Sequence, residues 1–119
     1  MLLTYRYLLR PTKGQRVRMD MLMEMQRQLY NAALQERIDA WRKFRASITR
    51  VDQQKSLAQI RAEDLTYAAV ASNMSRWTLK RVDDALKAFF ARAKKASGKA
   101  GFPRFRTFAR WRSFGFLEW

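Results

Sequence analysis

Apolar and polar residues alternate along both ends of this chain, whereas in the middle they recur with the spacing of a helix. The odd-numbered residues from Leu3 to Leu9 are all apolar or aromatic. Successive side chains of a strand point to opposite faces, so this alternation predicts a strand over residues 2–10. Pro11 ends the strand because it has no backbone N–H to donate.

A long helix is predicted from near Lys13 to about Phe44. Thr12 and Gln15 have the spacing of a capping box, in which the two side chains satisfy free N–H groups at the start of the helix. Apolar residues then recur on one side at 3.6 residues per turn. They are Leu22, Met25, Leu29, Ala33, Ala40 and Phe44.

Two further segments read as helical. Thr49 and Asp52 repeat the capping spacing before a shorter helix that extends to about Arg61. After a connection over residues 62–71, Ser72 is a candidate N-cap for a last helix that ends near Lys95.

Inward-facing positions follow from these two segments. In the connection they are Leu65, Tyr67 and Val70. In the last helix they are Met74, Val82, Ala85, Leu86, Phe89 and Ala93.

The segment from Gly101 to Trp119 alternates arginines with aromatic residues. Its arginines occupy even positions, and Phe105 and Trp111 occupy odd ones. The pattern predicts strands with one guanidinium face and one aromatic face, and a bend near residues 110–113. A lone N-terminal strand would leave its edges open, so we expect it to pair with these strands. The predicted fold is therefore α+β, with a mostly three-helix insert between parts of one sheet.

Composition narrows the function. The 119 residues carry 25 Lys and Arg against 10 Asp and Glu, a net charge of +15, and contain no Cys and no His. This surplus favours a polyanionic partner such as nucleic acid. Zinc sites, thiol nucleophiles and imidazole bases are excluded, and we expect no catalytic residue, cofactor or metal in this chain. No apolar run is long enough to span a bilayer, so a cytoplasmic protein is expected.

The candidate site is a set of basic side chains that would hold phosphate groups. It comprises Arg104, Arg106, Arg110, Arg112, Arg76, Lys80, Lys87, Arg27, Arg6 and Arg10. Phe105 and Trp111 either stack on bases or form the buried side of a strand. Asn31 either reads an adenine edge or makes an ordinary backbone bond. Asp83 and Asp84 are expected to form local ion pairs with Lys80, Lys87 or Arg81.

Four sequence blocks together resemble the N-terminal region of the OrfB/TnpB proteins of insertion sequences. They are LLTYRYLLRPTKGQ (2–15), LYNAALQERIDAWR (29–42), LKRVDDALKAFFARAK (79–94) and GFPRFRTFARWRSFGF (101–116). Gly14 departs from the family pattern, in which an acidic residue is common at this position. The segment around residues 70–74 lacks an expected proline.

The resemblance implies the N-terminal part of an RNA-guided DNA endonuclease of bacteria or archaea, related to type V CRISPR effectors. It implies a first wedge strand over residues 1–11, a helical recognition lobe over 12–96, and a linker with returning strands of an incomplete wedge-like β-barrel over 97–119. In this family the region binds guide RNA scaffold and target-flanking DNA, and a later RuvC-like domain cleaves. These 119 residues contain no acid cluster of that kind, so we expect a truncated, non-catalytic module.

Two other functions stay open from the sequence. Exposed strand edges could pair between copies and give a strand-swapped homodimer or assembly fragment. Alternatively, the helices over residues 12–96 could form a stand-alone DNA-binding protein, with the basic stripe of the last helix in a major groove.

Overall fold

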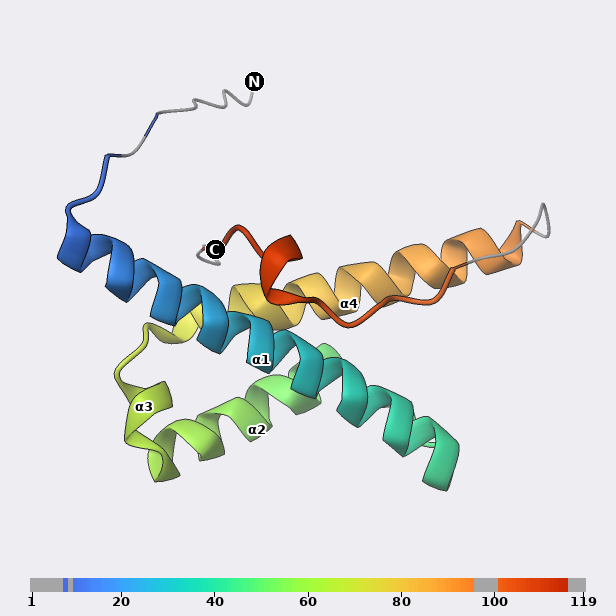
Figure 1. Cartoon of the computed structure of the whole chain (residues 1–119). Coiled ribbons are helices and arrows are strands. Elements are labelled where there is room, and N and C mark those ends of the chain that lie inside the picture. The colour runs from blue at the N-terminus through green and yellow to red at the C-terminus, as the bar shows by residue number, and fades with distance from the viewer. Residues whose placement is uncertain (1–7, 9, 96–100, 116–119) are drawn as a thin grey trace, which may run out of the picture.

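The chain folds around two long helices that cross, with shorter helices packed on one side (Figure 1). This computed structural model describes residue 8, residues 10–95 and residues 101–115. The elements are α1 (Lys13–Phe44), α2 (Arg50–Glu63), α3 (Leu65–Ala68), α4 (Ser72–Lys94) and the short 3₁₀ helix η1 (Phe108–Arg110).

Both predicted capping boxes are present. The Thr12 hydroxyl accepts a bond from the N–H of Gln15, and the Gln15 side chain accepts one from the N–H of Thr12. Thr49 and Asp52 make the same reciprocal pair at the start of α2. These bonds satisfy N–H groups that a helix start otherwise leaves free, which is why the predicted starts are confirmed.

The start of α4 and the connection before it differ from prediction. Ala71, rather than Ser72, occupies the cap position, and no side chain caps this helix. Leu65 begins the one-turn helix α3 and is 87% exposed, so its predicted inward position is wrong. Val70 is buried as expected. The Arg61 side chain of α2 donates to the carbonyls of Tyr67 and Val70, and so attaches the connection before α4 to α2.

The core lies where α1 crosses α4 and α2 packs against both. Its fully or nearly buried apolar side chains are Leu29, Tyr30, Ala33, Leu34, Leu57, Leu79, Val82, Leu86 and Trp111. The predicted inward positions Met74, Val82 and Leu86 of α4 are buried, whereas Ala93 is exposed. Phe44 is 79% exposed because the last turns of α1 extend beyond the other helices.

Buried polar groups join the helices as well. The Gln26 side chain of α1 accepts a hydrogen bond from the Thr78 hydroxyl at 2.7 Å and donates to the Ser75 hydroxyl at 3.4 Å. Near the other end of the crossing, the Arg37 guanidinium lies 3.2 Å from the Asp83 carboxylate of α4. Such pairs fix the rotation of α1 against α4, since an unpaired buried amide or carboxylate would be costly.

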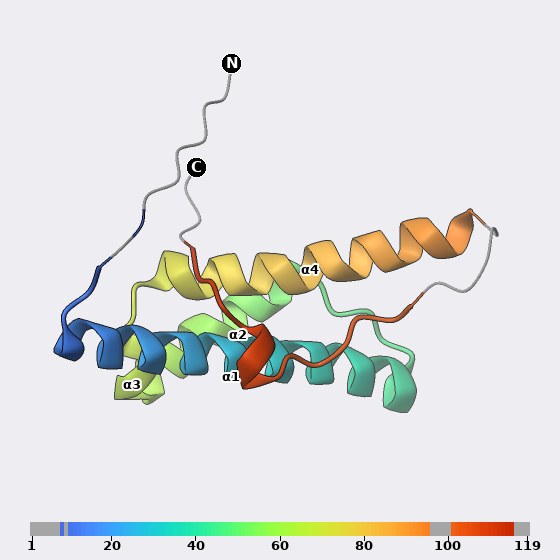
Figure 2. The same cartoon turned by 45° about the horizontal axis from the view of Figure 1, so that its top comes forward.

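The predicted α+β fold is wrong. No residue in the described ranges lies in a strand, and the described elements are all helical. Residues 101–115 run back from the far end of α4 across α1 as an irregular segment broken by η1 (Figures 1 and 2). The backbone groups of Gly101 and Arg106 bond to helix side chains, and the described ranges contain no part of a β-barrel. Most of the predicted N-terminal strand (residues 1–7 and 9) and residues 116–119 lie outside the described residues.

No helix in the described part of the chain is both long and apolar enough to cross a membrane.

Candidate nucleic-acid interface

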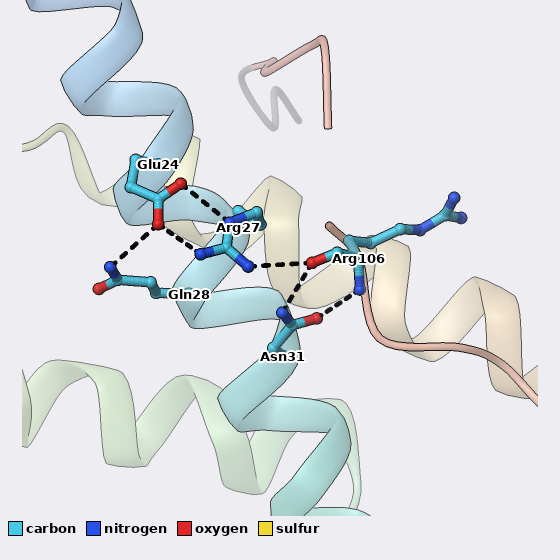
Figure 3. A network of polar contacts seen from close by, with 5 residues as sticks. All are labelled: Glu24, Arg27, Gln28, Asn31 and Arg106. Carbon is cyan, nitrogen blue, oxygen red and sulfur yellow. Dashed lines mark hydrogen bonds and ion pairs between the residues drawn. The ribbon is translucent and has the colours of Figure 1, made fainter. Parts of the chain in front are cut away.

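Residues 101–115, which we call the return segment, are held on α1 by a polar clamp (Figure 3). The Asn31 amide donates to the carbonyl of Arg106 at 3.0 Å and accepts from its N–H at 2.8 Å. Arg27 donates to the same carbonyl at 3.0 Å and also bonds Glu24. The bond from Arg27 lowers the pKa of the Glu24 carboxyl below its usual value. The clamp fixes the middle of an otherwise irregular segment.

Apolar and backbone contacts hold the return segment against α4. At its start, Arg92 donates to the carbonyl of Gly101, and the Phe102 ring lies 5.1 Å from that of Phe89. At its end, Gly115 lies against the face of Trp77, where a Cβ would come within 2.6 Å of the ring. The segment is therefore attached at both ends and at its centre.

Trp111 anchors the return segment in the core. It is 3% exposed, and its ring centroid lies 5.2 Å from that of Tyr30. The Arg81 guanidinium of α4 lies 4.3 Å from the Trp111 ring and 5.0 Å from the Trp77 ring. Burial, and then the nearby charge of Arg106, lower the pKa of Arg81. Of the two roles left open for Trp111, the structure shows packing.

The outer side of the return segment is basic and aromatic. A shallow hollow there is lined by Arg104, Phe105, Arg106, Thr107 and Arg110. Phe105 is 48% exposed and the neighbouring Phe108 is 56% exposed. Exposed rings between guanidinium groups can stack on bases while the arginines hold phosphates.

The four arginines predicted for a single strand face are divided by the fold. Arg104 and Arg110 are exposed, and within the described residues their side chains make no hydrogen bond or ion pair. Arg112 is exposed and donates to the carbonyl of Ala109. Arg106 is half-buried, with its guanidinium 5.7 Å from the Tyr30 ring. The hollow thus brings three of the four together, without Arg112.

The other predicted basic residues are scattered. Lys80 pairs with Asp84 at 2.7 Å and Lys87 with Asp83 at 3.0 Å, which confirms the expected local ion pairs. Arg76 lies in a separate hollow between α2 and the start of α4. The Lys80–Asp84 and Lys87–Asp83 pairs neutralise part of the basic stripe predicted on the last helix.

Three predicted polar residues remain. Arg27 is engaged in the clamp, Arg10 is exposed ahead of α1, and Arg6 lies outside the described residues. Asn31 bonds a backbone, as one of its two predicted roles required.

Sequence reasoning missed Arg81 as a site residue. Its signal was present in the spacing, since Arg81 follows Trp77 by one helical turn and therefore lies on the same side of α4. The spacing could not predict the contact of Arg81 with Trp111, because it depends on how the return segment packs against α4. Among the described residues, no three His, Cys, Asp or Glu side chains are grouped to hold a metal ion.

Residues 1–46 match the model of the IS605 OrfB helix-turn-helix domain family. This range covers the first two of the four resembling blocks, and the clamp residues Arg27 and Asn31 also fall inside it. This match supports the resemblance of the N-terminal region to the OrfB/TnpB proteins of IS605-type insertion sequences. Helix-turn-helix domains bind DNA and are not catalytic in themselves, so the match suggests a DNA-binding role for residues 1–46. Neither a curated protein nor a solved structure matches the chain.

The matched OrfB/TnpB range contains one helix in its described part. Residues 13–44 form α1 without a break, and the next helix, α2, begins beyond the range at Arg50. The groove-reading helix of the OrfB/TnpB region is therefore not identified by the match. The strand edges expected to support a homodimer do not occur in the described residues either.

Proposed function

We propose that this chain is the nucleic-acid-binding N-terminal module of a TnpB/OrfB-like RNA-guided nuclease, which holds guide RNA scaffold and target-flanking DNA while cleavage belongs to another domain. The observation that carries the proposal is the basic and aromatic hollow of the return segment. The family match supports the DNA-binding part of it.

The hollow suits a flexible, single-stranded or looped region of nucleic acid. The side chains of Arg104 and Arg110 make no bond within the described residues, so contacts with phosphate cost them no existing partner. Phe105 lies between them in the lining and is half exposed. Stacking on such a ring contributes about 1–3 kcal/mol per base and tolerates any sequence. In guided systems base pairing selects the target, so a binding surface of this kind needs no base-specific contact.

The rigidity of the hollow supports the same reading. Its backbone is clamped at Arg106, between the two exposed arginines, by Asn31 and Arg27. An ordered surface loses less conformational entropy when it binds than a mobile basic tail does. We therefore include the return segment with the helices of residues 12–96 in one binding lobe.

The test compares Arg104→Ala/Arg110→Ala with a charge-matched control, Arg42→Ala/Lys43→Ala, at the exposed end of α1. Binding to a labelled stem-loop RNA and to a DNA duplex of equal length is followed by fluorescence anisotropy across a salt series. We expect the hollow variant to bind at least tenfold more weakly, since bonds to charged groups contribute about 1.5–3 kcal/mol each. Its salt slope should fall by about 1.4 on single strands, for two lost phosphate contacts. Equal affinities and slopes in the two variants would refute the proposal.

A further inference from the structure

Two arginines lie where the return segment packs against α4, and no acid of the described residues pairs with either of them. Among the described residues, neither Arg81 nor Arg106 forms an ion pair. Nη1 of Arg81 and Nε of Arg106 are buried without a hydrogen-bond partner in the described part, and so is the indole Nε1 of Trp111. Three N–H donors in one neighbourhood therefore lack an acceptor. Buried donors are normally satisfied, so this cluster requires an explanation.

The three donors belong to one series of contacts, in which two cations flank a pair of rings. From the return segment inward, Arg106 lies 5.7 Å from the Tyr30 ring, and Tyr30 lies 5.2 Å from Trp111. The Arg81 guanidinium in turn lies 4.3 Å from the centroid of the Trp111 ring. Ring faces attract each cation. They do not remove the repulsion between the two guanidinium groups, which, after burial, contributes to the lowered pKa of Arg81.

We propose that Arg81 and Arg106 form a phosphate site that takes one phosphodiester group of a bound nucleic-acid strand. The three donors need acceptor oxygens, and the two guanidinium groups need a negative charge. A phosphate supplies both, and its oxygens match the planar fork of an arginine. Figure 3 shows the Arg106 guanidinium pointing away from the clamp that holds its backbone, so the side chain is not needed to dock the segment.

The site deepens the proposed function and rests on it. Arg106 also lines the outer hollow beside Arg104 and Phe105. A strand whose base stacks on Phe105 therefore has its backbone within reach of Arg106. This continuity favours a phosphodiester of a polymer over a free phosphate ion as the ligand.

The experiment uses the full chain with single-stranded oligomers of deoxythymidylate and of uridylate, and measures affinity by anisotropy at several salt concentrations. The variants are Arg81→Gln, Arg106→Gln and their combination, with Arg42→Gln as the matched control and circular dichroism as the check of folding. We expect each single change to weaken binding about tenfold. Because both arginines hold one phosphate, the combined variant should lose about 0.7 of salt slope rather than twice that amount. Arg81→Lys should retain the slope but bind more weakly than Arg81, since a lysine has no fork.

Two results would overturn the phosphate site. One is unchanged affinity and slope in a folded Arg81→Gln/Arg106→Gln variant while Arg104→Ala/Arg110→Ala loses binding, which leaves the proposed function intact. The other is a result that makes Glu118, which lies outside the described residues, the acid partner of Arg81. In that case Arg81→Gln would lower the melting temperature of the native chain but not that of the Glu118→Gln variant. An unmodified chain that binds neither oligomer, the stem-loop RNA nor the duplex would remove the proposed function, and the phosphate site with it.

Discussion

The side-chain amide of Asn31 bonds both the N–H and the carbonyl of Arg106, 75 residues further along the chain. This pair replaces the backbone partner that a neighbouring strand would have given Arg106. Through these two bonds, Asn31 attaches the return segment to α1. The arginines of the hollow are ordered through this contact.

Asn31→Ala should release the centre of the return segment. The change removes two hydrogen bonds, although Arg27 still satisfies the Arg106 carbonyl, and we expect a loss of about 1–2 kcal/mol. Hydrogen exchange at the Arg106 amide should accelerate, and binding to RNA should weaken through lost order. Gln35→Ala is the matched control, because Gln35 is an exposed α1 amide whose one side-chain partner in the described part of the chain is Asp39 of the same helix. Unchanged exchange at Arg106 would contradict the clamp.

Asp83→Asn should destabilise the fold far more than Asp84→Asn. Asp83 is almost buried and receives bonds from Arg37 and Lys87, so its loss leaves a half-buried guanidinium without its carboxylate. We expect a cost of about 2 kcal/mol for Asp83→Asn. Among the described residues Asp84 pairs with Lys80 alone, at the surface, and a change there should cost no more than about 0.5 kcal/mol. Urea unfolding of the two neighbouring variants measures the difference directly.

The same carboxylate sets an acid limit on stability. Burial by itself raises the pKa of Asp83, but the bonds from Lys87 and Arg37 outweigh it, and the net pKa lies below the ordinary value of 3.8. In the folded state the group therefore stays ionised to lower pH than in the unfolded chain. Its contribution is complete well above pH 3.8 and is lost as the pH falls through the folded pKa. Asp83→Asn should flatten the decline in stability below about pH 4, and an unaltered acid limb would contradict this.

Gly115→Ala should displace the end of the return segment from α4. A Cβ at this position would lie 2.6 Å from Cε2 of Trp77, which real side chains do not tolerate without movement. Since Trp77 also stacks on Arg81, the ring cannot shift freely, and we expect about 1–3 kcal/mol of destabilisation. Gly101→Ala is the control, because no atom lies within 4 Å of a Cβ there. Similar melting temperatures for the two variants would show that Gly115 is not packed as described.

Trp111→Ala should detach the return segment while the helices remain folded. Truncating a buried tryptophan typically costs about 3–5 kcal/mol, and Trp111 carries the main apolar contact between this segment and the core. Trypsin should then cleave at Arg104 and Arg110 much faster, with the helical circular dichroism retained. Phe108→Ala, at a residue 56% exposed, should leave the cleavage rate unchanged. Loss of the helical signal together with cleavage would instead make the segment part of one cooperative fold.

The sequence by itself determined the helices of this protein and where two of them begin. The capping pairs Thr12–Gln15 and Thr49–Asp52 act over three residues, and the apolar stripe of α1 needs only the helical period. The charge surplus and the aspartate–lysine pairs of α4 were likewise readable, because residues four apart on a helix are neighbours.

Only the tertiary structure decided the state of the return segment. Its alternation of arginine and aromatic residues is compatible with any extended backbone, and a strand further requires a partner for its N–H and C=O groups. Here the described partners are side chains of α1 and α4, including Asn31, Arg27 and Arg92. Those contacts join residues far apart in the chain, so no local pattern contains them. They bury Trp111 against Arg81 of α4 and leave Arg104 and Arg110 exposed.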